Sequence, residues 1–104
     1  MGKSLRREWE SCLKVLIVNL LKWFFQPELR GMSWQLNVQE QRDQLHELQA
    51  DNPSLKNQMT TSLDRTYPRA IKRAALETSL MEETFPKKCP FRLEDILNES
   101  FWPN

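Results

Sequence analysis

An apolar stretch near the start of the chain sets the strongest limit on its fold. Between Leu13 and Phe25 the charged or amide side chains are only Lys14, Asn19 and Lys22. A bilayer span needs about 20 consecutive apolar residues, so we interpret this shorter run as a buried helix and expect no membrane association. Because its apolar residues spread around most of a helical wheel, the helix needs neighbours on several sides.

Helical patterns continue along the rest of the chain, and prolines and capping residues divide them. Only two of the 104 residues are Gly, whereas folds built from tight hairpins usually need more. The expected elements are a helix from the N-cap Ser4 to about Gln26, a second after the N-cap Ser33, a third from Pro53, a fourth from Pro68 to Ser79 beyond a break or sharp kink, an irregular loop over 80–91, and a short helix from Leu93 to Glu99. We therefore predict an all-α fold: one domain, 1–104, forming a small bundle of four to five helices with an ordered proline-containing loop and a short C-terminal helix.

Four aromatic side chains near helix ends are expected to join the core. Trp23 and Trp34 lie on apolar stripes near the first turn, so they are predicted to clamp the corner between the first two helices. Phe101 and Trp102 follow the last helix and should dock back on the core, because two adjacent large aromatic side chains are costly to expose.

The residues that usually carry catalysis or metal binding are scarce. The chain has one histidine and two cysteines, a poor set for a site that needs three or four ligands. His46 lies on a polar stretch and is interpreted as a surface residue. Two glycines cannot build a phosphate-binding loop. We expect no catalytic residue, no cofactor and no metal, and hence no enzyme.

The two cysteines are interpreted as reduced thiols of a cytoplasmic protein, because the first residues show no signal-peptide pattern. Cys12 falls on the apolar face of the first helix and is expected to pack as a small hydrophobic residue. Cys89 follows Lys87 and Lys88, which would lower the pKa of its thiol if they lie close. Packing is the favoured interpretation for this cysteine as well.

A run of basic residues in the second half of the chain has two interpretations. Arg65, Arg69, Lys72 and Arg73 form one ridge if the bend at Pro68 is mild, and Lys3, Arg6 and Arg7 could add to it. Such a ridge could contact phosphates, but no interleaved aromatics accompany it and the net charge is only +1,. A solvated helix face is favoured, and any nucleic-acid binding should be weak and non-specific.

The first helix carries apolar residues beyond those of its main face. These are Val15, Val18, Leu21 and Phe25. We expect them to be partly bare and to form a partner interface, either in a homodimer or with a separate chain. The alternative is that the loop from Leu80 to Phe91 folds over them. The function predicted on this basis is a protein–protein interaction module, with a weak nucleic-acid-binding accessory protein as the alternative.

Several phrases, taken in order, carry a family resemblance. They are LLKWFFQPE over 20–28, SW over 33–34 followed by EQR over 40–42, NPSL over 52–55, YPRA over 67–70 with AALET over 74–78, and FPKKCPFRLEDIL over 85–97. With these motifs the sequence resembles, over nearly its whole length, the bacterial family catalogued as domain of unknown function, family twenty-nine. The resemblance implies an all-helical fold with no established activity or cofactor.

The resemblance also marks departures from the family pattern. Ser79 stands where the family usually has Gly, and Arg92 stands where a Thr commonly caps the last helix. Fuller members carry a further N-terminal helical segment with tryptophan and many acidic residues. The chain is therefore expected to be a short or truncated version of the family's domain, whose missing helices a separate chain would supply.

Overall fold

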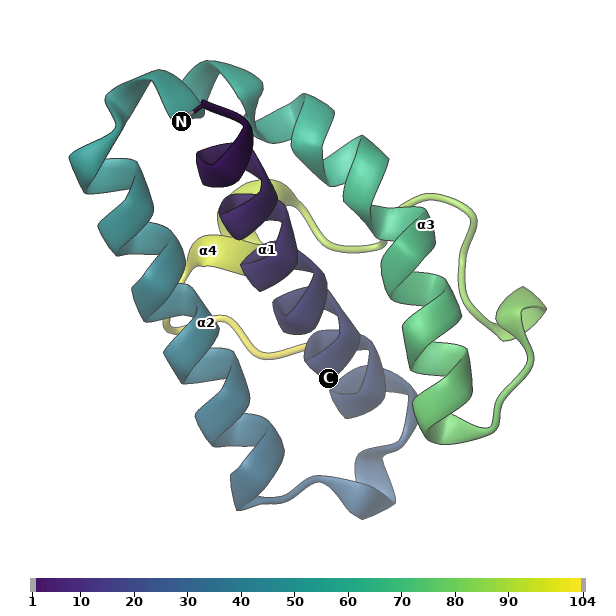
Figure 1. The fold of residues 1–104 in the computed structure, drawn as a ribbon. Coiled ribbons are helices and arrows are strands. Elements are labelled where there is room, and N and C mark those ends of the chain that lie inside the picture. The colour runs from purple at the N-terminus through teal and green to yellow at the C-terminus, as the bar shows by residue number, and fades with distance from the viewer. Residues whose placement is uncertain (1, 104) are drawn as a thin grey trace.

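Helices α1, α2 and α3 lie side by side with α1 in the middle (Figure 1). The computed structural model describes residues 2–103, and side chains from Leu5 onward. The elements are α1 (Gly2–Phe25), η1 (Pro27–Leu29), α2 (Met32–Asp51), η2 (Pro53–Gln58), α3 (Met59–Thr78), η3 (Glu82–Thr84) and α4 (Leu93–Leu97), where η marks a 3-10 segment. Every regular element in residues 2–103 is helical, which confirms the predicted all-α class.

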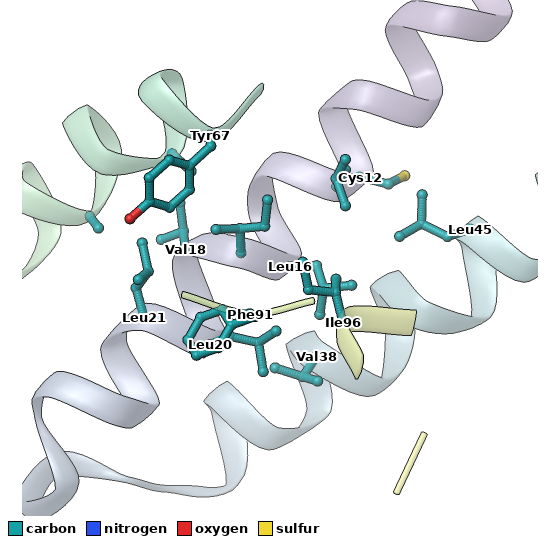
Figure 2. Packing of buried hydrophobic residues seen from close by; sticks show 14 of the residues in the cluster. Cys12, Leu16, Val18, Leu20, Leu21, Val38, Leu45, Tyr67, Phe91 and Ile96 are labelled. Atoms are coloured by element: carbon teal, nitrogen blue, oxygen red, sulfur yellow. The ribbon is translucent and has the colours of Figure 1, made fainter. Parts of the chain in front are cut away.

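The core is centred on α1, as its apolar stretch predicted. Leu13, Leu16 and Leu20 are fully buried, and burying one such side chain contributes about 1.5–3 kcal/mol,. Figure 2 shows these layers meeting: Leu16 and Leu20 of α1, Val38 and Leu45 of α2, Tyr67 of α3, and Phe91 and Ile96 of the C-terminal part of the chain. Ala70 and Ala74 have no exposed surface, and their small side chains let α3 approach α1 closely.

Two predicted helix starts are wrong. Helix α1 is already helical at Gly2, so Ser4 lies inside it, and the Ser4 side chain is outside the described part. Helix α2 begins at Met32 after Gly31, which has an extended backbone and acts as the N-cap. Gly is an accepted N-cap residue, and Ser33 consequently falls in the first turn instead of preceding it.

The expected break at Pro68 is also wrong, because α3 runs through it without interruption. Pro68 is exposed, so the backbone carbonyl that it leaves without an intrahelical donor can face water,. Its neighbour Tyr67 is 3% exposed and donates its hydroxyl to the Pro86 carbonyl at 2.6 Å. Burial raises the pKa of this phenol to about 12. Packing on both sides of the proline therefore holds the helix together.

Helix α3 ends at a residue with a left-handed backbone. Ser79 has φ 63° and ψ 16°, and its N–H donates to the Ala75 carbonyl. Glycine favours this conformation because it has no Cβ. This backbone requirement explains why the family usually has Gly at the position that Ser79 occupies in this chain. The Thr78 hydroxyl accepts a hydrogen bond from the Leu80 N–H and supports the turn.

The C-terminal segment docks back on the bundle, as Phe101 and Trp102 predicted. Trp102 packs against Trp23 with ring centroids 4.7 Å apart. Trp23 and Trp34 are both only half-buried, so their assignment to the core is wrong. Trp23 instead contacts the tail, and Trp34 lies under the ammonium group of Lys22 at 4.8 Å. Trp34 of α2 thus contacts α1 at the predicted corner through Lys22, whereas Trp23 packs on the tail instead of on α2.

The tail is held by a buried arginine of α2. Arg42 is 1% exposed, and its Nε donates to the Ile96 carbonyl at 2.7 Å while Nη2 donates to the Phe101 carbonyl at 2.9 Å. Longer bonds reach the carbonyls of Asp95 and Glu99. Desolvation lowers the pKa of this guanidinium, although an arginine stays charged in proteins,. One side chain thus fixes α4 and the residues after it.

Candidate functional site

The four residues predicted to form a partner interface do not make a bare apolar face. Val18 is 3% exposed and Leu21 is fully buried, while Val15 and Phe25 are half-buried. Phe25 meets Phe85 of the 80–91 loop at 5.1 Å between centroids. The expectation of exposure is therefore wrong for Val18 and Leu21, and the loop covers Phe25. Pairing of two copies stays a prediction without this support.

Part of that face lines a groove instead. Its floor is the side of α1 that carries Ser11, Lys14, Val15, Val18 and Lys22, and its volume is about 420 Å³. At about 100° per residue, Ser11, Val18 and Lys22 point away from Leu13, Leu16 and Leu20, which pack on the core. Asn37 of α2 forms one wall of this groove. Arg73 and Glu77 of α3 form the other.

The groove extends toward the start of α1. A second hollow of about 270 Å³ lies between Arg7, Glu10 and Ser11 of α1 and Thr66 and Arg69 of α3. Ser11 and Lys14 line both hollows, so the two adjoin on the same side of α1. We call the combined surface the α1 groove. From Arg7 to Lys22 it is about 22 Å long, at a helical rise of about 1.5 Å per residue.

The α1 groove unites the two surfaces that the sequence predicted separately. Since α3 is continuous, Arg65, Arg69, Lys72 and Arg73 do form one exposed ridge on it. Arg69 and Arg73 line the groove, whereas the described linings do not include Lys72. Of the more N-terminal cations, Arg7 lines the groove, Arg6 is exposed, and the Lys3 side chain lies outside the described part.

Positive charge prevails in the groove. Five cationic side chains line it against two carboxylates: Arg7, Lys14, Lys22, Arg69 and Arg73 against Glu10 and Glu77. Both carboxylates are already paired. Glu77 binds Lys22 at 2.9 Å and Arg73 at 2.6 Å, and Glu10 binds Arg65 of the neighbouring ridge at 2.7 Å.

The two ion pairs of Glu77 favour the charged form of its carboxyl group. The hydrogen bond from Lys22, together with the one from Arg73, lowers the pKa of the Glu77 carboxyl. No ion pair within residues 5–103 engages Arg7, Lys14 or Arg69. These three side chains therefore leave the groove with cations that no carboxylate of the described part neutralises.

Among the residues that the structure describes, two buried polar atoms of the groove have no hydrogen-bond partner. Asn19 is 4% exposed and donates its Nδ2 to the Val15 carbonyl, but its Oδ1 accepts no bond. Thr66 is 2% exposed, and its hydroxyl is also unpaired. Buried polar groups are normally satisfied, and both residues line the groove. A third unpaired atom, Trp9 Nε1, belongs to the hydrophobic core cluster.

The thiols have the environments that packing requires. Cys12 is buried and its Sγ contacts Gln44 Oε1 at 3.1 Å. Desolvation, followed by the charges of Glu8 and Glu40, raises the pKa of this thiol. Burial also raises the pKa of the half-buried Cys89 thiol, the opposite direction from the lowering that nearby Lys87 and Lys88 would produce.

His46 is exposed, as expected, and its Nε2 lies 2.8 Å from the Leu97 carbonyl. Among the residues that the structure describes, no group of three or more His, Cys, Asp or Glu side chains could hold a metal ion. No helix in residues 2–103 is both long and apolar enough to cross a membrane.

Sequence reasoning missed Arg42, Asn19 and Lys14. Arg42 lies four residues after Val38 and three before Leu45, both on the buried stripe of α2, which was the available signal for its burial. Lys14 shares one side of α1 with three other polar residues. It follows Arg7 by seven residues and Ser11 by three, and it precedes Lys22 by eight. That periodicity marks a helix side that the core does not cover.

The fold and the groove define a small all-α protein built on one central helix, with one side of that helix left open between two others. Among protein-family models, the domain of unknown function DUF29 matches residues 1–102 of this chain. The chain therefore belongs to this family, as its sequence motifs predicted. No curated protein and no solved structure matches it.

Proposed function

We propose that this protein is a cytoplasmic protein–protein interaction module that receives a helix of a separate partner chain in the α1 groove. The observation that supports this most directly is the unequal covering of α1. Helices α2 and α3 flank it and the tail packs on a third side, while the fourth side carries the groove. A partner helix there would complete a four-helix arrangement, in which neighbouring axes are typically about 8–10 Å apart.

A separate chain is favoured over a second copy. In a two-fold dimer the same patch meets itself, so symmetric pairing through the groove would set its excess of positive charge against an equal excess. Like charges juxtaposed across an interface cost several kcal/mol. We therefore propose a separate partner chain, and the crosslinking experiment below also detects a homodimer if one forms.

Nucleic-acid binding remains the second candidate, because the ridge of α3 is continuous and exposed. Two of its four cations, Arg65 and Arg73, are engaged by Glu10 and Glu77. Arg69 and Lys72 would be left to contact phosphates. With two such contacts, the logarithm of the binding constant for duplex DNA should fall with the logarithm of salt concentration at a slope of about −1.8, which is typical of weak binding.

Site-specific photo-crosslinking in cells that naturally express the protein tests the proposal. The crosslinking residue replaces Asn37, an exposed residue of the groove wall, and in a control it replaces Asn57, an exposed residue of η2. We expect a protein adduct from position 37 that Ser11→Trp abolishes by filling the groove, and none from position 57. Equal adducts from both positions, or none, would overturn the proposal. A nucleic-acid adduct would favour the second candidate, and an adduct between two 12.4 kDa chains would indicate self-association.

A further inference from the structure

We infer that the α1 groove selects an acidic amphipathic helix, one whose apolar strip is flanked by glutamate or aspartate; this inference rests on the proposed function and assigns the chemistry of the partner. The juxtaposition that carries it is a set of cations from two helices beside the half-buried Val15. Lys14 and Lys22 of α1 line the hollow that contains Val15, and Lys14 also lines the neighbouring hollow together with Arg69 of α3.

Charge complementarity decides the sign of the partner. Arg7, Lys14 and Arg69 enter no ion pair within residues 5–103, and all three line the same hollow as Ser11. Carboxylates of a helix lying over α1 would pair with them at the rim. Pairing across an interface steers association and sets specificity more than it adds affinity, so a basic helix of the same shape should be rejected.

The floor argues for a helix over a polyphosphate chain. Val15 is half-buried and offers a partner an apolar contact, while Val18 is almost fully buried and adds little surface to cover. Bases of single-stranded nucleic acid usually stack on aromatic side chains. None of the described lining residues is aromatic.

The two unpaired oxygens add a requirement for a hydrogen-bond donor. Asn19 Oδ1 and Thr66 Oγ1 are buried without partners beneath the groove. A glutamine or serine side chain in the middle of the bound helix would supply a donor to Asn19 Oδ1 once a small side-chain shift exposes that atom. A partner that donates to this acceptor binds more tightly than one that leaves it unpaired. The residue of the partner helix that lies over Asn19 should therefore distinguish one acidic helix from another.

A pair of synthetic peptides of about 15 residues, the groove's length, tests the inference by isothermal titration calorimetry. Both carry one leucine strip and a central glutamine; one flanks the strip with glutamates and the other with lysines. We expect the glutamate peptide to bind the full chain at least tenfold more tightly than the lysine peptide. Replacing its central glutamine by leucine should weaken binding about threefold, and Asn19→Leu should remove that difference.

Charge reversal of the protein supplies the matched controls. The double variant Lys14→Glu with Arg69→Glu should lose at least tenfold in affinity for the glutamate peptide and gain affinity for the lysine peptide. Lys87→Glu with Lys88→Glu reverses two charges on the exposed loop and should change affinity less than twofold. Circular dichroism of each variant verifies the fold, and the gain for the lysine peptide cannot arise from unfolding.

The outcomes separate this inference from the proposed function. Equal binding of both peptides overturns the charge assignment, as does tighter binding of single-stranded RNA through Lys14 and Arg69. If neither peptide binds but position 37 crosslinks to a partner, the inference fails and the proposed function stands. If the glutamate peptide binds with the expected dependence while no partner is crosslinked, the groove's chemistry stands and the proposed function fails.

Discussion

The two sides of α1 that do not face α2 or α3 differ in how their polar groups are satisfied. On the tail side, the donors of buried Arg42 reach four backbone carbonyls of the C-terminal segment, and Trp102 packs on Trp23. On the groove side, Asn19 and Thr66 each leave a buried oxygen unpaired. The chain closes one side of its central helix with its own tail and leaves a groove on the other side, although Trp9 Nε1 of the core is also without a partner among the described residues.

The largest expected effect comes from a substitution on the tail side of α1. Arg42→Met should lower the free energy of unfolding by about 3 kcal/mol, because the carbonyls of Ile96 and Phe101 lose charged donors in a buried setting. Urea unfolding followed by circular dichroism measures this loss. Arg69→Met, which removes an exposed cation of the groove side, should change the same quantity by less than about 0.5 kcal/mol. Equal losses for the two variants would contradict the difference between the two sides.

A smaller loss is expected at the tail's aromatic contact. Trp102→Ala should destabilise the protein by about 2 kcal/mol, less than a fully buried tryptophan, because both rings of the pair are half-buried,. Together with Trp23→Ala it forms a double-mutant cycle, in which we expect a coupling energy of about 0.5–1.5 kcal/mol. Additive effects would show that the two rings do not stabilise each other.

The central helix and the fold class could be predicted because they follow from local patterns. The apolar stretch from Leu13 to Phe25 had to be buried, and helical spacing continued beyond it. The continuity of α3 through Pro68 could not be predicted from the proline itself. It depends on whether water or protein faces the backbone carbonyl that the missing N–H of Pro68 leaves without a donor. Tyr67 and Ala70 pack on the core while Pro68 is exposed, and only the tertiary structure shows this.

The candidate site was predictable in part. Val15 and Val18 were singled out for their position on α1, and Arg69 and Arg73 for their spacing on α3. Their meeting on one surface depends on how α3 packs beside α1, which no local pattern specifies. Arg42, which fixes the tail, is charged, and charged residues are almost never fully buried unless paired; its partners are backbone carbonyls, which leave no mark in the sequence.

A third prediction concerns the groove side of α1, where removing a polar group should raise the free energy of unfolding instead of lowering it. Thr66→Val keeps the side-chain shape and removes an unpaired buried hydroxyl, so it should raise the free energy of unfolding by about 1 kcal/mol. Asn19→Leu should act in the same direction. Thermal unfolding of the isolated protein checks both variants. A loss of stability in Thr66→Val would mean that this hydroxyl is satisfied in solution and that the groove side is not under-bonded.

The smallest effect concerns Glu77, whose ion pairs border the groove. The hydrogen bond from Lys22, then that from Arg73, holds the pKa of this carboxyl below its ordinary value. Because the pKa is lower in the folded than in the unfolded state, the pairs stabilise the fold above the unfolded pKa, and this stabilisation is lost as pH falls through the folded pKa.

Acid titration of stability can detect this contribution. Since Glu77 is partly exposed, the loss should stay below about 1 kcal/mol, mostly between about pH 5 and pH 3,. Urea midpoints measured across that range should fall less steeply in Glu77→Gln than in the unchanged protein. Glu82→Gln removes an exposed carboxylate that no ion pair of residues 5–103 engages, and it should leave the slope unaltered. If Glu77→Gln left the slope unaltered as well, these cations would not be committed to Glu77, and Lys22 and Arg73 would add to the charge available for an acidic partner.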